Sequence, residues 1–399
     1  MPAPPMTAVD QFRLASLPPA ELAAVASAAA GREVQRATAR AVPVNYDWGS
    51  PATAGLWRAD VRARADGTVF DQVFFVKLLR HPRLWPELSQ IPDEAARQDF
   101  VSFFPWRFEL EMHECGIGEI LPDGMRTPVL YQARPVDADH VVLWWEYVDQ
   151  RPGPWELADY RRAARLLGAL AARRQAGADA NRRLPELSRR MAPGEALRYF
   201  VAGKVLRGCL PALGADSTWR HPVLAAALRE AADPGLPADL AALGARLPAV
   251  LDRLDQLPQC YAHGDATPQN LLIPADRPAE LVVIDWGFGS LLPVGFDLGQ
   301  LLVGLASAGQ TPLTDLPRID AVIFAGYLDG LSDEGYGADP GEVRAGYVGG
   351  LAARSALCLL PLERLACEPP SPDLQALFLR RLQLTRRVHD LTAEIHGIS

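Results

Sequence analysis

The sequence predicts an α+β protein of two lobes, with a small N-terminal lobe built on an antiparallel sheet and a larger, mainly helical C-terminal lobe. Strand patterns concentrate before residue 149, and helical patterns dominate after it. A polar, proline-containing segment at residues 149–154 separates the two patterns. The chain of 399 residues is long enough for two lobes around a cleft, where ligands usually bind.

The N-terminal part divides into residues 1–32, a leader with a short helix, and residues 33–148, the small lobe. Residues 1–17 predict a loose leader. The Pro and Glu residues within 17–21 are typical of a helix start and begin a short alanine-rich helix. From about Glu33 the pattern becomes extended.

Two strands are predicted at residues 56–65 and 68–79, joined by Asp66 and Gly67. Asp-Gly is a strong hairpin signal, because Gly adopts positive φ at low cost. Residues 103–115 predict a helix. The apolar run 141–148 predicts a buried strand that ends the small lobe.

Residues 149–399 form the predicted helical lobe. Residues 155–174 have the pattern of a long amphipathic helix. Residues 185–257 are mostly helical, and two short strands are predicted around 260–285 before helices continue to the C-terminus. Turns or loops separate these helices at residues 211–214, 233–237, 309–318, 332–341 and 368–372.

Bulk composition narrows the class of protein. Apolar and charged fractions of 49% and 22% are typical of a folded soluble protein. The net charge of −8 gives no support to a nucleic-acid surface, which usually carries a basic excess. The five cysteines lack metal-binding spacing and predict reduced thiols. With no signal-peptide pattern and no membrane-length apolar run, we expect a cytoplasmic monomer or homodimer that binds neither nucleic acid nor membrane.

Three polar residues follow two short apolar stretches in the C-terminal lobe. Asp265 ends the sequence His-Gly-Asp, and Asn270 follows five residues later. The next apolar strand ends at Asp285, in Asp-Trp-Gly. Each motif alone is more often a simple turn, but two adjacent strands would bring all three side chains to one end of one hairpin. Two carboxylates and an amide oxygen suit Mg²⁺.

HGDATPQN followed by VIDWG resembles the catalytic loop and metal-binding segment of the aminoglycoside phosphotransferase and choline kinase-like superfamily. The resemblance covers roughly residues 40–360. It implies the two-lobed protein-kinase-like fold. It also implies transfer of the γ-phosphate of ATP, or of GTP as the alternative donor, with Mg²⁺. The phosphate acceptor would be a hydroxyl of a small molecule such as an aminoglycoside, a sugar or an amino alcohol.

The resemblance assigns roles to the motif residues. Asp265 would be the catalytic aspartate that orients the acceptor hydroxyl and accepts its proton. Asn270 and Asp285 would ligate Mg²⁺. His263 would brace the catalytic loop through hydrogen bonds. Asp297 resembles a downstream aspartate that supports this loop, or else caps the helix that begins near residue 298.

One lysine, Lys77, interrupts an apolar strand of the small lobe. A buried ammonium group needs a partner, so Lys77 should point into the cleft or reach outward to solvent. Its position matches the lysine that binds ATP phosphates in the resembled family. Glu109 is the first candidate for its acidic partner and Glu111 the second, because Met112 leaves Glu109 at the edge of the apolar stripe.

Other candidate nucleotide contacts come from the small lobe. The loop 49–55, which contains Ser50, would lie over the phosphates, although it lacks the pattern GxGxxG. Glu146, Tyr147 and Val148 occupy the junction where kinases present backbone groups to adenine. A simple buried strand end would explain these three residues almost as well.

The acceptor pocket of the resembled family would fall within residues 185–220 and 300–365. Its charge balance is mixed, and charges on helices are usually solvated, so the sequence leaves the acceptor open. The acids are Glu195, Asp216, Asp333, Glu334 and Glu363, and the arginines are Arg189, Arg190, Arg198, Arg207, Arg354 and Arg364. Tyr199, Phe200, Trp219, Phe324 and Tyr327 could stack on a sugar or pack in the core.

Three rival functions remain. A protein kinase would usually carry Lys at Thr267, where many members of the resembled family carry His, and would have an Ala-Pro-Glu segment after Asp285. A nucleotide-binding pseudokinase or regulatory module would not need Asp265, Asn270, Asp285 and Lys77 together. A metal-dependent hydrolase would be expected to use a His-rich ligand set.

Overall fold

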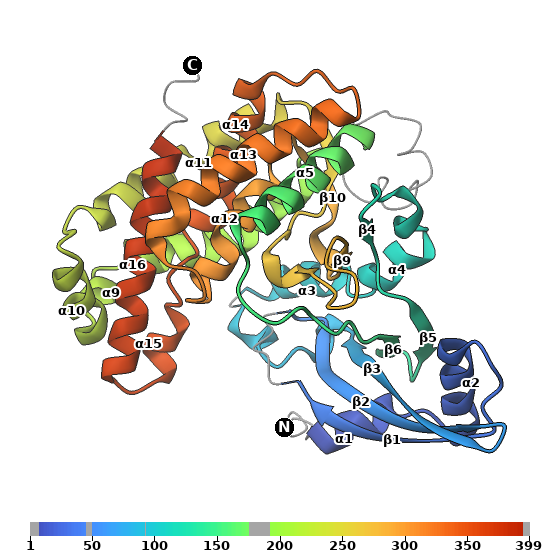
Figure 1. Cartoon of the computed structure of the whole chain (residues 1–399). Coiled ribbons are helices and arrows are strands. Elements are labelled where there is room, and N and C mark those ends of the chain that lie inside the picture. Colours follow the sequence, from blue (N-terminus) through green and yellow to red (C-terminus); the bar gives the residue numbers. More distant parts are fainter. Residues whose placement is uncertain (1–7, 45–49, 92, 175–191, 394–399) are drawn as a thin grey trace.

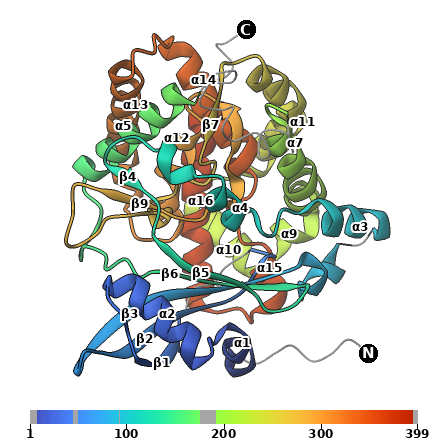
Figure 2. The same cartoon turned by 90° about the vertical axis from the view of Figure 1, so that its right-hand side faces the viewer.

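In the computed structural model, the two lobes join just after β6 (His140–Glu146) (Figure 1). The structure describes residues 8–44, 50–91, 93–174 and 192–393. The small lobe carries the larger sheet, and the other lobe is mainly helical, as Figure 2 shows from the side. The predicted two-lobed α+β fold class is confirmed.

A five-stranded antiparallel sheet forms the small lobe, in the order β1-β2-β3-β6-β5. Asp66 and Gly67 join β2 to β3, with φ angles of 49° and 78°. These left-handed angles are the ones that a two-residue hairpin turn requires, so the predicted strands and turn are confirmed. The strands are β1 (Arg36–Pro43), β2 (Thr53–Ala65), β3 (Thr68–Arg80), β5 (Leu130–Pro135) and β6.

Two N-terminal helices, α1 (Ala8–Ala15) and α2 (Pro19–Ala30), pack on this sheet (Figure 1). The prediction of a loose leader at residues 1–17 is wrong where α1 forms. Phe12 lies 5.6 Å from the ring of Trp57, and the indole nitrogen of Trp144 donates a hydrogen bond to the carbonyl of Ala15 at 3.2 Å. The segment folds because it covers apolar sheet residues.

The helix predicted at residues 103–115 is wrong in extent. The structure has two helices, α3 (Glu94–Phe103) and α4 (Phe108–Glu114). Asp93 caps α3 by accepting a hydrogen bond from the backbone of Ala96 at 2.9 Å. Pro105 breaks the pattern, because proline lacks an N–H and disfavours a helical residue before it.

The predicted helix 155–174 is confirmed as α5 (Leu157–Arg173), which begins with a capping box between Glu156 and Asp159. Two π-helical segments, Val201–Cys209 and Leu351–Ala356, pack against each other. The part of the predicted helical region at 185–191 lies outside the described residues. The remaining helices are α7 (Glu195–Phe200), α8 (Leu210–Gly214), α9 (Asp216–Arg220), α10 (Pro222–Ala231), α11 (Leu236–Asp255), α12 (Asp297–Ser307), α13 (Leu316–Asp333), α14 (Pro340–Gly350), α15 (Glu363–Cys367) and α16 (Pro372–Thr392). Among the helices of the described ranges, none combines the length and the apolar character needed to cross a membrane.

Two small sheets are built mainly from strands that lie between α11 and α12 in the sequence. One pairs β7 (Gln259–Ala262) with β10 (Ser290–Pro293) in antiparallel fashion. The other has the order β4-β9-β8, in which β4 (Met125–Arg126) runs parallel to β9 (Leu281–Val283) and β8 (Leu271–Leu272) runs antiparallel to it. The strand β4 comes from the small-lobe half of the chain, so this sheet ties the two lobes together.

Glycines allow α5 and α13 to pack in close contact. A Cβ on Gly168 would lie 2.2 Å from the carbonyl oxygen of Tyr327, and a Cβ on Gly330 would lie 1.9 Å from that of Arg165. Both distances are too short for real atoms. Larger residues at these two positions would therefore push the helices apart.

We therefore expect Gly330→Ala to lower the free energy of unfolding by about 1–3 kcal/mol, the usual effect of overpacking a core. Urea unfolding followed by circular dichroism measures this. Gly337→Ala is the matched control, because nothing lies within 4 Å of its Cβ position. Equal stability of the two variants would contradict the close packing of α5 and α13.

Candidate active site

The strands β8 and β9 bring Asn270 and Asp285 together. Leu271 lies opposite Val283 in this hairpin, and the backbone of Ile284 donates a hydrogen bond to the carbonyl of Asn270 at 3.0 Å. Asn270 and Asp285 therefore lie at the same end of the hairpin, as predicted. The expectation that Asp265 shares this hairpin is wrong, because Asp265 follows β7, which pairs with β10.

Asp265 meets Asn270 across the loop that joins β7 to β8. The side-chain nitrogen of Asn270 donates to the carbonyl oxygen of Asp265 at 2.9 Å and to its Oδ2 at 3.2 Å. Gly264 permits the sharp turn before Asp265, because its φ is +76° and a Cβ would lie 2.5 Å from the carbonyl oxygen of Phe288. The side chain of Asp265 remains 32% exposed.

His263 links the two motifs from the interior. The fully buried ring accepts a hydrogen bond at Nδ1 from the backbone of Asp265, at 3.2 Å. Its Nε2 lies 2.9 Å from the carbonyl oxygen of Ile284, which only accepts, so Nε2 carries the proton. The ring also contacts Trp286, with centroids 4.7 Å apart and planes tilted by 45°. His263 thus has the geometry of a brace between the loop and the turn at Asp285.

Asp297, buried at the start of α12, supports the same loop. Its Oδ2 accepts from the backbone of His263 at 3.0 Å, and its Oδ1 accepts from the backbone of Gly264 at 2.7 Å. Burial raises the pKa of this carboxyl, and the two backbone donors and His263 oppose the shift. Both oxygens bind the loop, and neither caps α12.

Asp285 adopts the left-handed conformation, with φ 58° and ψ 62°, which is uncommon for a residue other than glycine. Its side chain is 48% exposed. The carboxylate of Asp285 and the side-chain oxygen of Asn270 are hard donors at one end of one hairpin. This donor chemistry fits Mg²⁺, which takes oxygen ligands and retains waters.

Lys77, on β3, reaches the same place from the small lobe. Its Nζ lies 2.5 Å from Oε2 of Glu109 on α4 and 4.0 Å from Oδ1 of Asp285. Burial alone would lower the pKa of Lys77, but the carboxylates of Glu109 and Asp285 outweigh it, and the net pKa is raised. Of the two candidate partners, the structure pairs Lys77 with Glu109.

Loss of Lys77 should leave the carboxylate of Glu109 buried without its partner. We expect Lys77→Met to lower the free energy of unfolding by about 3–5 kcal/mol, and Lys77→Met combined with Glu109→Leu to recover most of that loss. Urea unfolding measures both. Arg58→Met is the control, because Arg58 and Asp60 form an exposed pair on the same sheet. A single variant as stable as the control would contradict the importance of the buried pair.

Ser50 lies just before β2, where its carbonyl accepts a hydrogen bond from the backbone of Thr53 at 3.3 Å. Arg80 fixes this turn, since its Nε donates to the carbonyl of Pro51 at 3.0 Å. Gly49, the other end of the predicted phosphate loop, lies outside the described residues.

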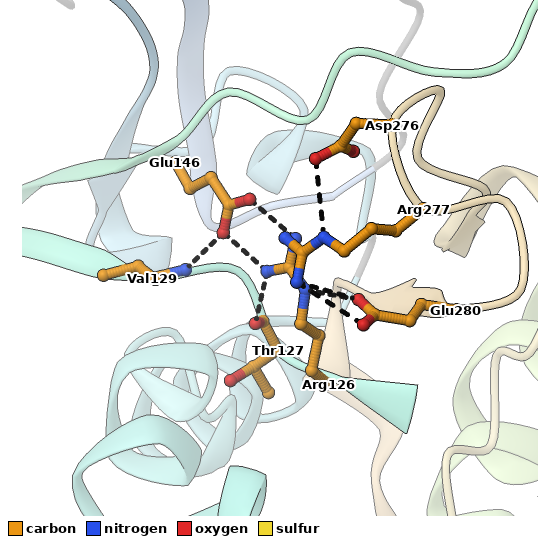
Figure 3. Close-up of polar contacts among 7 residues, drawn as sticks. All are labelled: Arg126, Thr127, Val129, Glu146, Asp276, Arg277 and Glu280. Atoms are coloured by element: carbon orange, nitrogen blue, oxygen red, sulfur yellow. Dashed lines mark hydrogen bonds and ion pairs between the residues drawn. The ribbon is translucent and has the colours of Figure 1, made fainter. Parts of the chain in front are cut away.

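Glu146, at the end of β6, is held by a residue that the sequence analysis missed. Arg126 binds both of its carboxylate oxygens, at 2.6 and 2.7 Å, and also contacts Glu280 at 3.3 Å (Figure 3). Burial would raise the pKa of Glu146, but the hydrogen bonds from Arg126 and Val129 prevail and lower it. Arg126 and Glu280 are 154 positions apart, so no local pattern could pair them.

The backbone N–H of Glu146 donates to the carbonyl of Val129 at 2.7 Å. This N–H is therefore not available to an adenine edge in the observed conformation. Within the described chain, the backbone groups of Tyr147 and Val148 make no hydrogen bond. The adenine contact of Glu146, Tyr147 and Val148 stays a prediction.

Arg354 is the second residue whose position the sequence did not indicate. Its Nη2 donates to Oδ1 of Asp265 at 2.7 Å. In the sequence, Arg354 is one of several helical charges and lies 89 positions from Asp265, so no local pattern connects the two residues.

Most other charges considered for the acceptor pocket bind partners elsewhere. The acids Asp216, Asp333 and Glu334 pair with Arg220, Arg165 and Arg173, and Glu195 accepts from the backbone of Ala192. Glu363 and Arg207 are exposed, Arg198 pairs with Asp252 and Asp255, and Arg364 pairs with Glu368. Arg189 and Arg190 lie outside the described residues.

Of the aromatic candidates, Phe200 makes a cation–π contact with Arg354. The side chain of Tyr327 is buried, and its hydroxyl accepts a hydrogen bond from the backbone of Gly295. Trp219 donates to the carbonyl of Leu213, Arg344 lies over Phe324, and Tyr199 is exposed.

Comparisons with known proteins agree with this geometry at the level of the family. The model of the phosphotransferase enzyme family matches residues 60–344, well over half of the chain. None of the curated proteins matches significantly.

Similar solved structures include an aminoglycoside phosphotransferase from Streptomyces rimosus, in complex with ADP and streptomycin. It has 16% identity and a TM-score of 0.40, over 79% of this chain and 92% of that one. The choline kinase of Streptococcus pneumoniae has 11% identity and a TM-score of 0.39, over 88% and 94%. The ethanolamine kinase of Plasmodium vivax has 12% identity and a TM-score of 0.43, over 87% and 81%.

Proposed function

The chain belongs to the phosphotransferase enzyme family, and from this premise we propose that it is a small-molecule kinase. It transfers the γ-phosphate of a magnesium nucleotide to a hydroxyl of an aminoglycoside, a sugar or an amino alcohol. ATP is the proposed donor and GTP the alternative. The reaction takes place in the cytoplasm, where ATP is available.

The observation that carries the proposal is the meeting of Lys77 with Asp285 at 4.0 Å. A buried, ion-paired lysine of the small lobe faces a half-exposed carboxylate of the large lobe, beside Asn270. The ammonium group of Lys77 lies beside oxygen ligands for a metal, and this combination suits a nucleoside triphosphate.

Each residue then has a role. Lys77, positioned by Glu109, binds phosphate oxygens, and Tyr147 and Val148 offer backbone groups to the base. Asn270 and Asp285 would hold Mg²⁺, which would supply positive charge against the charge that develops on the phosphates.

Asp265 orients the acceptor hydroxyl, with His263 as the brace of its loop. The acceptor oxygen forms a bond to the γ-phosphorus while the bond from that phosphorus to the β-γ bridging oxygen breaks. The nucleoside diphosphate leaves with the bond electrons, and the hydroxyl proton passes to Asp265.

The test is a screen for acceptor-dependent ADP release with aminoglycosides, amino sugars, sugars, amino alcohols and nucleosides. A true acceptor should gain the mass of one phosphate, and Asp265→Asn should abolish the gain. Absence of ADP release across the panel, together with retained nucleotide binding, would favour the alternative of a nucleotide-binding regulatory module.

A further inference from the structure

Arg354 brings a positive charge to the carboxylate that the proposed reaction uses. Its Nη2 is 2.7 Å from Oδ1 of Asp265, while Asn270 binds Oδ2 of the same carboxylate at 3.2 Å. The side chains of Arg354 and Asp265 are 13% and 32% exposed, so the pair is partly buried and the carboxylate is the more accessible member.

Two aromatic rings hold the guanidinium in place. Its central carbon lies 4.0 Å from the ring centroid of Phe288 and 5.0 Å from that of Phe200. The two rings meet edge to face at 5.5 Å. Cation–π contacts with both rings restrict the orientation of Arg354. The residue lies in the π-helical segment Leu351–Ala356, and such segments occur frequently at functional sites.

A hydroxyl that binds Asp265 must lie near this guanidinium. Because both groups contact one carboxylate at about 3 Å, the hydroxyl oxygen and Nη2 are within about 8 Å of each other, and closer where both bind Oδ1. Guanidinium offers only donors. Its Nη1 is buried and makes no hydrogen bond with any residue of the described chain, so Arg354 holds an unsatisfied donor for an oxygen that reaches it.

The carboxylate of Asp265, in contrast, already has hydrogen-bond partners. Asp265 is bound by Arg354 and Asn270, and three of the acids considered for the pocket pair with surface arginines. An ammonium group beside the reacting hydroxyl would meet a like charge and no unpaired carboxylate among these residues.

We infer that Arg354 determines acceptor specificity: it selects an acceptor with an oxygen, either hydroxyl or carboxylate, next to the reacting hydroxyl, and disfavours an amine there. The inference rests on the proposed function and narrows it to polyols, neutral sugars and hydroxy acids. Amino sugars and amino alcohols with the amine beside the reacting hydroxyl become poor acceptors.

The experiment uses two acceptor series, each built on one scaffold. The first is glucose, glucosamine and glucuronate, and the second is glycerol, 2-amino-1,3-propanediol and glycerate. The full chain is assayed at saturating magnesium ATP, and kcat/KM is measured for each acceptor by ADP release with mass confirmation. We expect the neutral or acidic member to exceed the amino member by about 10- to 100-fold, the usual contribution of a hydrogen bond to a charged group.

Variants test the residue directly. Arg354→Gln should reduce this preference to within about threefold and leave the KM for ATP unchanged, whereas Arg354→Lys should keep the order of preference. Arg344→Gln is the matched control, because Arg344 also pairs with an acid, Asp320, and stacks on Phe324 and Tyr347. The control should have the same acceptor preference in kcat/KM as the unchanged chain. Thermal melting checks that each variant is folded.

Two outcomes would overturn the inference and are distinct from failure of the proposed function. One is a preference of the unchanged chain for the amino member of each active series. The other is an equal loss for all acceptors in Arg354→Gln, which would make Arg354 a positioning residue for Asp265 alone. If no acceptor in a broad panel gained phosphate, the proposed function itself would fail, and this inference with it.

Discussion

Asp265→Asn should reduce kcat for phosphoryl transfer by about 100- to 10,000-fold, the contribution expected of a general base. Asparagine has nearly the same shape, but its amide does not accept the acceptor proton. The fold should persist, because Asp265 is partly exposed and its loop is held independently by Asp297 and His263. ADP release with an acceptor found in the screen measures the loss.

Nucleotide binding separates a catalytic role from a structural one. In Asp265→Asn, the affinity for magnesium ATP, measured by calorimetry, should change by less than about threefold, since the proposed metal ligands and Lys77 are intact. Asp216→Asn is the control, because Asp216 is an exposed residue of α9 paired with Arg220. Turnover of Asp265→Asn equal to that of the control would rule out Asp265 as the base.

Features that local chemistry signals could be predicted from the sequence. The hairpin of β2 and β3 follows from Asp66-Gly67, since the turn chemistry is local. The pairing of Lys77 followed from a general requirement, because a charge in an apolar strand needs a counter-charge. Glu109 met that requirement from a short helix whose apolar face is readable in the sequence.

Features that depend on contacts between distant residues could not be predicted from the sequence. Arg126 reaches Glu280 and Arg354 reaches Asp265 only after the chain has folded, and each is surrounded by ordinary helical or strand patterns. The helix α1 was missed for a similar reason: its stability comes from Trp57 and Trp144, which are far away in the sequence. Tertiary contacts, which local propensity does not encode, determine the positions of Arg126 and Arg354 and the formation of α1.

Asp285→Ala should abolish the magnesium-dependent part of nucleotide binding. The substitution removes the carboxylate proposed to ligate the metal and also one of the two carboxylates near Lys77. We expect the dissociation constant for ATP with Mg²⁺ to rise at least about tenfold, and the value in EDTA to change little, since a hard cation depends on its charged oxygen ligands.

Thermal melting gives an independent measurement of the same effect. A ligand that binds only the folded state stabilises it in proportion to the logarithm of its concentration over its dissociation constant. Magnesium ATP should therefore raise the melting temperature of the unchanged chain and of Asp276→Ala, an exposed acid in the turn before β9. It should raise the melting temperature of Asp285→Ala by a clearly smaller amount. A full shift in Asp285→Ala would remove this residue from the metal site, and Asn270, at the same end of the hairpin, would then have to bind the ion without it.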